Sequence, residues 1–410
     1  MSDFNFLEDA VAGLRRFASL GVAVSGGSDS LALLRLLHAL GGPELRVATV
    51  DHGLRAEAAS EAERVAEICA DLGLAHECLR WGDWDGTGNL QDQARRARYR
   101  LLAEWGQRQG LDAIALGHTM DDQAETFVMR LSRQAGVDGL SQMAVEFQRG
   151  GMVFVRPLLG CRRADLRGYL QDLGQDWIDD PSNEDARFDR VKARRALEAL
   201  RPLGIEAKTL AQVAEHMSGA RDALGTLAAG AADRLARLEA GDLVFDRDGF
   251  HALPREICRR LIVAALRFIS PSDYAPRSQP VSAILDAIGI GKGATLHGVR
   301  VLVRAGGVLF TRELSAVQDL AAPTDELWDA RWRMHGDHGS DLHTGALGED
   351  GLAFCPDWRN TGIARQSLVA SPAIWRDKAL ISAPIAGFSA GWCAELAQNR
   401  DEYVNSLIPY

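Results

Sequence analysis

Short apolar runs alternate with longer stretches of helical periodicity through the first part of the chain. Runs rich in Val, Ile, Leu and Ala predict strands at residues 21–25, 45–50, 76–81, 112–116 and 152–155. Apolar residues three and four positions apart predict helices at residues 4–18, directly after the first strand and its turn, and at 57–72, 89–109 and 118–134. Because parallel strands need crossovers of this length, we expect an α/β fold with a doubly wound, mostly parallel, five-stranded sheet.

The pattern changes beyond residue 160. Helical periodicity continues in three segments, at residues 161–174, at 186–201 and in a long Ala/Leu-rich region that runs to about residue 239. Residues 294–314 read as a hairpin that turns at residues 305–307, and after Pro323 the helical periodicity fades. We therefore expect an α/β domain, then a helical and hairpin domain, then a small β-rich module to which the sequence assigns no role; their bounds are 1–215, 216–318 and 319–410.

One polar turn, SGGSDS at residues 25–30, separates the first strand from the helix that follows it. Its adjacent glycines let the backbone approach an anion, and the free amides and positive dipole end of the helix point toward it. Ser25, Ser28 and Ser30 add hydroxyl donors. The turn therefore predicts a phosphate-binding loop, with an ordinary glycine turn as the structural alternative.

This loop is not a Walker A motif, which needs a lysine at the helix start. Asp29 stands there instead, and the pair Gly291–Lys292 lacks the glycine five residues upstream. A carboxylate beside phosphates suits a pyrophosphate leaving group that Mg²⁺ bridges.

A second polar stretch, GHTMDDQAET at residues 117–126, follows the fourth predicted strand. Helical spacing places His118, Asp122 and Glu125 on one face, with Asp121 beside them. Carboxylates gathered in this way repel one another, which is energetically unfavourable unless a cation or a basic substrate neutralises them. Capping of the first helical turn explains part of the pattern, but it explains neither Glu125 nor His118.

Two further positions complete the candidate site. On the helix at 89–109 an apolar stripe leaves Arg95 and Arg98 along one edge, where they could bind a phosphate or a carboxylate; a solvated basic face fits the spacing equally well. Asp51 follows the second predicted strand. Ligands of parallel sheets bind at the carboxyl ends of the strands, where Ser25, Asp51 and His118 are all expected.

Composition limits the class of protein. An apolar share of 47% and a charged share of 25% are typical of a globular protein, and the most apolar run, residues 261–269, is too short to span a membrane and contains Arg267. A net charge of −10 argues against a protein coated in nucleic acid, although a local basic patch remains compatible with it. The N-terminal residues show no basic region of a signal peptide, so we expect a cytoplasmic protein.

The cysteines argue against several kinds of site. The chain has six, without a CxxC pair or a Cys/His cluster: Cys69, Cys78, Cys161, Cys258, Cys355 and Cys393. This spacing disfavours structural zinc, an iron–sulfur cluster and a disulfide framework.

In combination the motifs resemble one family, the tRNA(Ile)-lysidine synthases of the PP-loop ATP pyrophosphatase superfamily. The matching motifs are, in order, SGGSDS at 25–30, VDHGLR at 50–55, the arginine-rich helix at 94–99, GHTMDDQAET at 117–126, RPLL at 156–159 and DPSN at 180–183. The resemblance covers about the first 200 residues, and the hairpin at 294–314 is similar to the family's following domain. It implies an adenine nucleotide alpha-hydrolase-like fold.

The resemblance also implies a reaction. ATP would adenylate the C2 carbonyl oxygen of the wobble cytidine of tRNA(Ile) with anticodon CAU, releasing pyrophosphate. The ε-amine of free L-lysine would then attack C2 and expel AMP, which leaves lysidine and changes codon reading from AUG to AUA. The implied cofactors are ATP and Mg²⁺. The implied partners are the tRNA and lysine, with a homodimer as the assembly we consider.

Site residues follow from the matched positions. The resemblance implies ATP binding by Ser25, Gly26, Gly27, Ser28, Asp29, Ser30 and Asp51. It implies metal binding by Asp29 and Asp122, and catalysis by Asp29, His118, Asp122 and Glu125 with Arg95 or Arg98. The basic stretch implies tRNA contacts for Arg190, Lys192, Arg194 and Arg195; here the chain departs from the family, which usually has an RNR-type run where this one has Arg190–Val191–Lys192.

Three alternatives remain open. A tRNA thiolase of the same fold would need a nucleophilic or clustered cysteine, and Cys69, Cys78 and Cys161 lack that context. A glutamine-dependent ligase of the asparagine synthetase type would need an N-terminal cysteine, where this chain has Ser2. A non-catalytic nucleotide-binding module is hard to reconcile with the acidic helix at 118–125.

Overall fold

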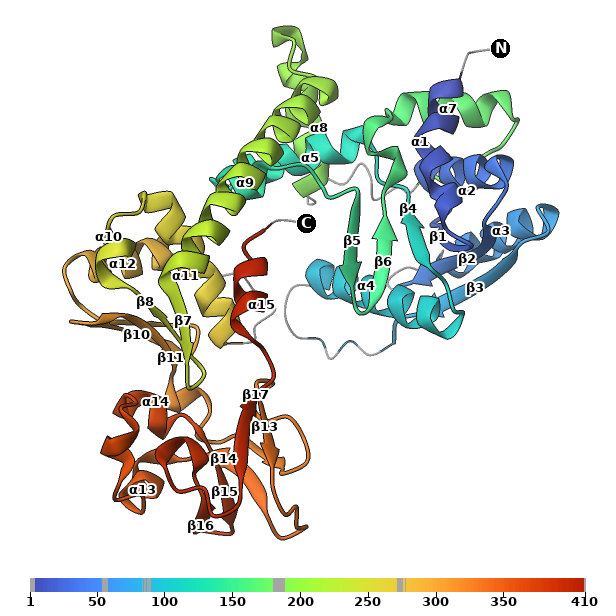
Figure 1. Ribbon diagram of the computed structural model, residues 1–410. Helices are drawn as coiled ribbons and strands as arrows, with labels where there is room; N and C mark the ends of the chain where they lie inside the picture. Colours follow the sequence, from blue (N-terminus) through green and yellow to red (C-terminus); the bar gives the residue numbers. More distant parts are fainter. Residues whose placement is uncertain are drawn as a thin grey trace. The chain divides into compact units, whose positions relative to one another are not determined.

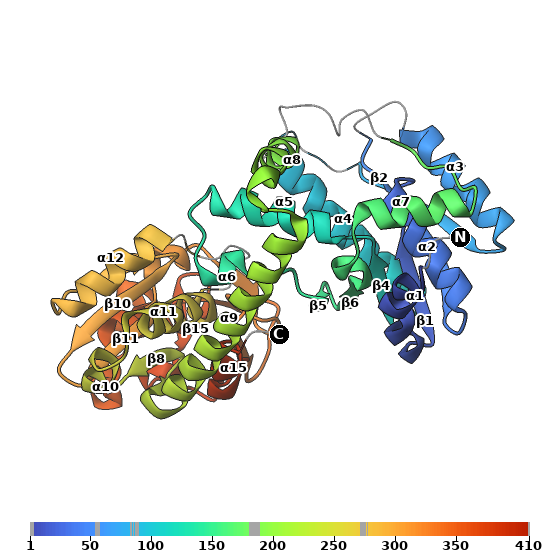
Figure 2. The same ribbon diagram turned by 90° about the horizontal axis from the view of Figure 1, so that it is seen from above.

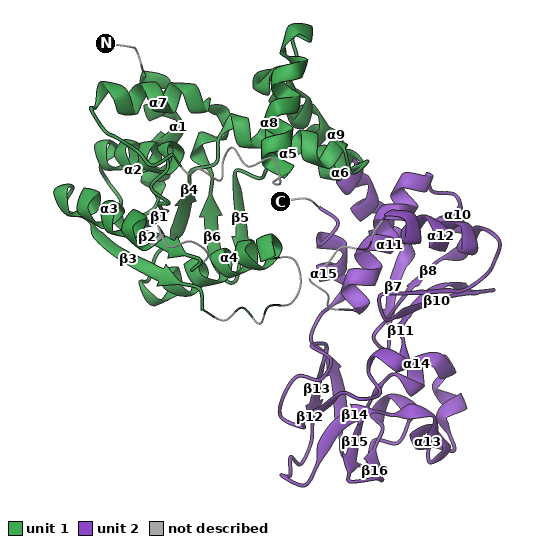
Figure 3. Ribbon diagram, turned by 180° about the vertical axis from the view of Figure 1, so that it is seen from behind, with its two compact units in different colours: residues 1–221, 410 green, residues 222–409 purple. Residues whose placement is uncertain are grey.

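The computed structural model describes residues 4–53, 58–82, 84, 86, 90–179, 189–270, 276 and 278–408 (Figure 1). The chain forms two compact units, residues 1–221 (unit 1) and 222–409 (unit 2) (Figure 3). Parts of two motifs lie outside the described residues, namely Leu54–Arg55 and the DPSN stretch at 180–183, as does Asn89. The division into three domains stays a prediction.

Unit 1 contains the expected parallel sheet. Its strand order is β3-β2-β1-β4-β6-β5. The strands are β1 (Ser19–Ala23), β2 (Glu44–Asp51), β3 (Ala75–Arg80), β4 (Ala113–Leu116), β5 (Glu146–Arg149) and β6 (Met152–Val155). The five parallel strands confirm the predicted fold class. The sequence missed β5, an antiparallel edge strand, because three of its four residues are exposed and leave no apolar signal.

Helices cover both faces of this sheet (Figure 2). One face is covered by α1 (Asn5–Ala12), α2 (Ser28–Leu40), α3 (Ala58–Asp71) and α7 (Arg163–Asp172), and the other by α4 (Leu90–Arg108). The remaining helices pack on one another in a separate cluster: α5 (Met120–Leu131), α6 (Val137–Leu140), α8 (Asp189–Leu200) and the first part of α9 (Ala207–Leu235). Neighbouring strand residues divide between two cores: Val22 packs in the core with α1, α2 and α7, whereas Ala23 packs in the core with α4. This alternation is what a strand buried on both faces requires.

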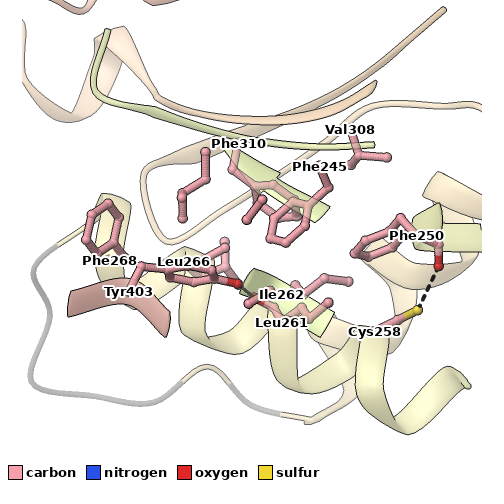
Figure 4. Packing of buried hydrophobic residues seen from close by; sticks show 14 of the residues in the cluster. Phe245, Phe250, Cys258, Leu261, Ile262, Leu266, Phe268, Val308, Phe310 and Tyr403 are labelled. Carbon is pink, nitrogen blue, oxygen red and sulfur yellow. Dashed lines mark hydrogen bonds between the residues drawn. The ribbon is translucent and has the colours of Figure 1, made fainter. Parts of the chain in front are cut away.

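Unit 2 begins with a sheet packed on helices. The sheet order is β7-β8-β11-β10-β9, from β7 (Ala236–Glu239), β8 (Asp242–Phe245), β9 (Ala294–Leu296), β10 (Val299–Arg304) and β11 (Gly307–Arg312). The predicted hairpin is confirmed as β10–β11, where Arg304 pairs with Gly307. The helices are α10 (Arg247–His251), α11 (Arg255–Ile269) and α12 (Ser278–Gly289). Figure 4 shows the core between α11 and the sheet, in which the Tyr403 hydroxyl donates to the Leu261 carbonyl at 3.1 Å.

The rest of unit 2 is rich in short strands, as expected. Two sheets, β12-β14-β15-β16 and β13-β17, are built from β12 (Ala321–Pro323), β13 (Trp332–His335), β14 (His343–Ala346), β15 (Pro372–Arg376), β16 (Ala379–Ser382) and β17 (Cys393–Leu396). Three short helices accompany them, α13 (Gly348–Ala353), α14 (Arg365–Val369) and α15 (Arg400–Asn405). Among the helices of the described residues, none combines the length and apolar character needed to cross a bilayer.

Candidate active site

The glycine-rich turn between β1 and α2, residues 25–30, is called the phosphate loop below. Gly26 has a φ of +87°, and a Cβ atom there would lie 2.7 Å from Ile178 Cδ1, so both the backbone conformation and the space require glycine. The Gly26 carbonyl accepts a hydrogen bond from the Ile178 amide at 2.9 Å. Gly27 precedes α2 and has no side chain to cap it, so the first-turn amides of α2 are available to an anion.

The serines of the phosphate loop make different contacts. The Ser30 hydroxyl accepts from the Ser25 amide at 3.1 Å and donates to the Gly27 carbonyl at 3.0 Å, so it closes the loop. The Ser28 hydroxyl donates to Asp29 Oδ1 at 3.0 Å. Ser30 therefore shapes the turn, whereas Ser25 is exposed.

Asp51 lies at the carboxyl end of β2, the parallel neighbour of β1, and thus at the same sheet edge as the phosphate loop. Its Oδ1 accepts a hydrogen bond from the Gly53 amide at 2.8 Å, which forms a local turn. The ring of His52 lies edge-on to Trp81, with 5.9 Å between ring centres.

The acidic stretch at 117–126 begins helix α5 through a capping box. Asp122 Oδ2 accepts from the Thr119 amide at 2.8 Å, and the Asp122 amide donates back to Thr119 Oγ1 at 3.4 Å. Capping therefore accounts for one oxygen of Asp122. Asp121 has a structural contact too, because its Oδ2 accepts from the backbone amide of Arg163 at 2.7 Å and ties α5 to α7.

Asp29, Asp122 and Glu125, here called the carboxylate cluster, meet at one arginine. Arg163 donates from Nε to Asp29 Oδ2 at 2.8 Å, from Nη2 to Asp122 Oδ1 at 3.4 Å and from Nη1 to Glu125 Oε1 at 3.3 Å. Arg194 Nε also donates to Glu125 Oε1, at 2.6 Å. The Glu125 side chain is 1% exposed, and its Oε2 has no hydrogen-bond partner among the described residues. The cluster thus retains an unused acceptor.

Burial and charge compete in this cluster. Burial raises the pKa of Asp29, although Arg163 opposes it. Burial would also raise the pKa of Asp122, but Arg163, Arg190 and His118 together bring it below its usual value. Burial disfavours the charged form of Arg163, yet the three carboxylates raise its pKa above the ordinary range. Arg163 is therefore fully protonated and supplies the main positive charge of the cluster.

His118 is held in one tautomer. Arg156 Nε donates to His118 Nδ1 at 3.2 Å, which places the ring proton on Nε2. Arg156 is itself fixed by the Ala144 carbonyl at 2.8 Å and lies 4.1 Å from the centre of the Phe147 ring. Burial, with Arg98 nearby, lowers the pKa of His118 to about 3. His118 is therefore neutral near pH 7 and offers a hydrogen-bond donor.

Two arginines of α4, Arg95 and Arg98, have different surroundings. Arg95 is exposed, with its guanidinium carbon 5.4 Å from the centre of the Tyr99 ring. Arg98 is half-buried. The pKa values of His52 and His118 are both lowered, first by burial and second by the positive charge of Arg98. Arg98 thus influences the predicted site more directly than Arg95.

The basic residues of α8 also divide into two groups. Arg190, Lys192 and Arg195 are exposed, and Lys192 Nζ lies 3.3 Å from Asp189 Oδ1. Arg194 instead faces inward to Glu125, with its side chain 31% exposed. The structure therefore brings Arg194 into the carboxylate cluster and leaves Lys192 and Arg195 at the surface. Arg190 is exposed too, but its charge lowers the pKa of Asp122 and that of His118.

Sequence reasoning missed two arginines of the site, Arg156 and Arg163. The available signal was charge balance, since three carboxylates on neighbouring elements need a cation and the helix at 161–174 is rich in arginine. The described residues contain no group of three or more His, Cys, Asp or Glu side chains placed to hold a metal ion. Asp29 and Asp122 nevertheless suit Mg²⁺, which is often bound by one or two carboxylates together with substrate phosphates.

The chain is similar to known proteins. A family model described as a PP-loop domain matches residues 5–200. The tRNA(Ile)-lysidine synthase of Ruegeria pomeroyi is 48% identical over 394 residues, covering 95% of this chain and 94% of that protein. Proteins of the same name from Bradyrhizobium sp. and Bradyrhizobium diazoefficiens are 40% and 37% identical, covering 75% and 80% of this chain and 92% and 94% of their own lengths.

Proposed function

Because the chain belongs to the tRNA(Ile)-lysidine synthase family, we propose that it ligates lysine to C2 of the wobble cytidine of tRNA(Ile) with anticodon CAU. It is an ATP-dependent enzyme with a PP-loop domain. The main observation behind the proposal is that a site suited to anions, the phosphate loop, lies next to a site suited to cations, the carboxylate cluster. The amides of the phosphate loop and the carboxylate cluster share Asp29, so a triphosphate and a cationic substrate can bind side by side.

The phosphate loop would bind ATP so that AMP is transferred. The C2 carbonyl oxygen of cytosine is a poor leaving group, and attachment of AMP makes it a good one. Main-chain amides of α2 would stabilise the charge that grows on the pyrophosphate. Asp51, at the neighbouring strand end, lies where the nucleoside part of ATP would bind.

Asp29 and Asp122 are the residues that would hold Mg²⁺. Asp29 Oδ2 and Asp122 Oδ1 both accept a hydrogen bond from Arg163. When bound, the ion would neutralise charge on the phosphates of ATP.

The ε-ammonium of lysine would bind at Glu125, whose buried Oε2 accepts no hydrogen bond from the part of the chain that the structure describes. Arg194, which donates a hydrogen bond to Glu125, would bind the α-carboxylate of lysine. We also propose that Arg95 contacts the substrate, as the sequence predicts. His118 would orient a reacting oxygen through its Nε2 proton, since Arg156 occupies Nδ1 and its low pKa makes it a weak base.

The exposed residues Arg190, Lys192 and Arg195 would bind the tRNA backbone around the anticodon loop. For Arg194 we propose a contact within the active site in place of the predicted tRNA contact. The cytoplasmic location and the homodimer stay predictions.

The cysteines disfavour thiolation. Burial raises the pKa values of Cys69 and Cys161 to about 11, and burial together with Asp51 raises the pKa of Cys78. Thiols of this kind are poor nucleophiles near neutral pH. The relatives named above are lysidine synthases, which agrees with this reading.

The test is a reconstituted reaction of the full chain with ATP, Mg²⁺, labelled lysine and unmodified tRNA(Ile) bearing CAU. We expect label in the tRNA, with AMP and pyrophosphate released in equal amounts, and lysidine at the wobble position by mass spectrometry. Methionine tRNA, which also has a CAU anticodon, is the matched control and should stay unlabelled. Formation of ADP, or sulfur in the nucleoside, would contradict the proposal.

A further inference from the structure

We propose that Arg163 is an exchangeable counter-ion: it neutralises the carboxylate cluster in the substrate-free enzyme and leaves it for the phosphates of ATP, so that nucleotide binding opens the lysine site. This inference rests on the proposed function, because it concerns the same cluster. It adds a residue that couples the two substrates.

Arg163 occupies the oxygens that the cationic ligands need. Its three bonds end on Asp29 Oδ2, Asp122 Oδ1 and Glu125 Oε1. A metal ion or an ammonium group that bound these atoms would stand within a few ångströms of the guanidinium, and like charges repel strongly where water is scarce. Arg163 and the cationic ligands therefore exclude each other at these oxygens.

The bonding of Arg163 is suited to exchange. Only the Asp29 contact is short, while the contacts with Asp122 and Glu125 are 3.4 and 3.3 Å long. The Glu125 Oε1 atom receives two arginines while Oε2 receives none among the described residues. Departure of Arg163 would leave Arg194 on Glu125 and would free the remaining acceptors for a new cation.

The phosphate loop offers Arg163 a destination. This loop has no lysine to neutralise the phosphates, and Arg163 already contacts its Asp29. One helical turn further along α7, Arg167 Nε donates to the Ser28 hydroxyl of the loop at 3.3 Å. Helix α7 thus presents two arginines to the loop from one face. The guanidinium plane matches phosphate oxygens as well as it matches carboxylates.

A coupling between substrates follows. If ATP draws Arg163 away, ATP binding must raise the affinity for lysine, and by linkage lysine must raise the affinity for ATP by the same factor. A residue that only supports the fold would produce no such coupling. The exchange also predicts opposite effects of removing Arg163 on the two ligands.

The experiment measures lysine binding by calorimetry in the full chain, with Mg²⁺, in the presence and absence of an ATP analogue whose α and β phosphates are joined by methylene. In the wild type we expect the analogue to tighten lysine binding by about tenfold, within the usual range of coupling between sites. In Arg163→Gln, lysine alone should bind about tenfold more tightly than in the wild type, the analogue should bind about tenfold more weakly, and the coupling should vanish.

Arg162→Gln is the matched control. Arg162 is the preceding residue, has a side chain 61% exposed and pairs with Asp165, so its variant should keep the wild-type values. Arg163→Lys serves if the glutamine variant does not fold: it keeps the charge, but an ammonium cannot form the same fork, so the coupling should fall between those of the wild type and Arg163→Gln.

Two results would overturn the inference. One is weaker lysine binding in Arg163→Gln, which would give Arg163 a supporting role, and the other is coupling that persists in this variant. Failure of the proposed function is a different result, because then the wild type would attach no lysine to tRNA. If the wild type attaches lysine while Arg163→Gln keeps normal coupling, only the inference fails.

Discussion

Both units of the molecule bury arginine–carboxylate contacts, and the two are built differently. In unit 2, Arg312 meets Asp329 in a two-to-two fork, with Nε–Oδ2 and Nη2–Oδ1 distances of 2.9 Å. In unit 1, the single guanidinium of Arg163 is divided among three carboxylates from two helices, α2 and α5. The fork satisfies both partners, whereas Glu125 Oε2 in the cluster has no partner within the described ranges. Buried charge alone thus does not identify a site; incomplete pairing beside an anion-binding loop does.

The largest effect should come from breaking the unit 1 cluster at Asp29. Asp29→Asn keeps the shape but removes the charge that faces the phosphates and Arg163. We expect lysine incorporation into tRNA to fall by about a thousandfold, equivalent to about 4 kcal/mol in the reaction barrier. Single-turnover assays with labelled lysine measure it. Activity within tenfold of the wild type would show that Asp29 is not part of the catalytic machinery.

Breaking the unit 2 fork should affect stability instead. Asp329→Asn leaves Arg312 without its carboxylate, and asparagine tolerates the left-handed backbone at this position, where φ is +49°. Removing one partner of a buried pair should cost about 3 kcal/mol of unfolding free energy. Chemical denaturation measures this loss, and the lysine incorporation rate of the folded variant serves as the control. A loss of activity without a loss of stability would reverse the contrast between the units.

One buried group in each unit, His118 in unit 1 and Asp242 in unit 2, should change stability with pH in opposite directions. Burial, with Arg98 nearby, lowers the pKa of His118 to about 3 in the folded state, below its ordinary value of about 6.5, so between these pH values the unfolded chain binds a proton that the native state does not. The contribution of His118 to stability is complete above pH 6.5 and decreases as the pH falls, by about 2 kcal/mol at pH 5. Asp242 in unit 2 has a pKa that burial raises to about 7, so its contribution decreases as the pH rises from about 4 to about 7.

Variants of His118 and Asp242 test the direction in which each residue changes stability with pH. Relative to the wild type, His118→Asn should lose less stability on going from pH 7 to pH 5, and Asp242→Asn should lose less on going from pH 5 to pH 7. Thermal unfolding at a series of pH values measures both differences. Equal pH profiles for wild type and variant would show that the group has the same pKa in the folded and unfolded states.

The smallest expected effect is on tRNA binding, and it should differ between exposed and inward-facing residues of α8. Lys192→Ala with Arg195→Ala removes two exposed charges, and we expect about tenfold weaker tRNA binding and a salt slope reduced by about 2. Arg194→Ala is the matched variant, because Arg194 faces Glu125. It should weaken lysine binding with little change in the salt slope. A salt slope equally reduced by Arg194→Ala would return Arg194 to the tRNA contacts.

The parallel sheet and the phosphate loop were predictable because local patterns encode them. Strands buried on both faces read as apolar runs, and the glycines mark a turn that a Cβ atom would block at Gly26. The acidic face of α5 was predictable for the same reason, since helical spacing alone brings Asp122 and Glu125 together.

The missed features depend on contacts between distant parts of the chain. Arg163 lies 134 positions after Asp29, and no local pattern links them. Arg156 stood in a recognised motif, but its bond to His118 depends on a residue 38 positions earlier. The edge strand β5 carries little apolar signal, yet its residue Phe147 packs against Arg156. Position in sequence predicts which residues share an element, and only the fold decides which elements meet.

The bond between Asp121 and the backbone amide of Arg163 has a kinetic consequence. It fixes the start of α7 to α5, so the guanidinium can change partners by rotation about its own side-chain bonds. Rotamer changes of exposed side chains take roughly picoseconds to nanoseconds, whereas enzyme turnover commonly takes milliseconds or longer. The exchange of Arg163 between the carboxylates and the phosphates of ATP would therefore not limit the rate of turnover.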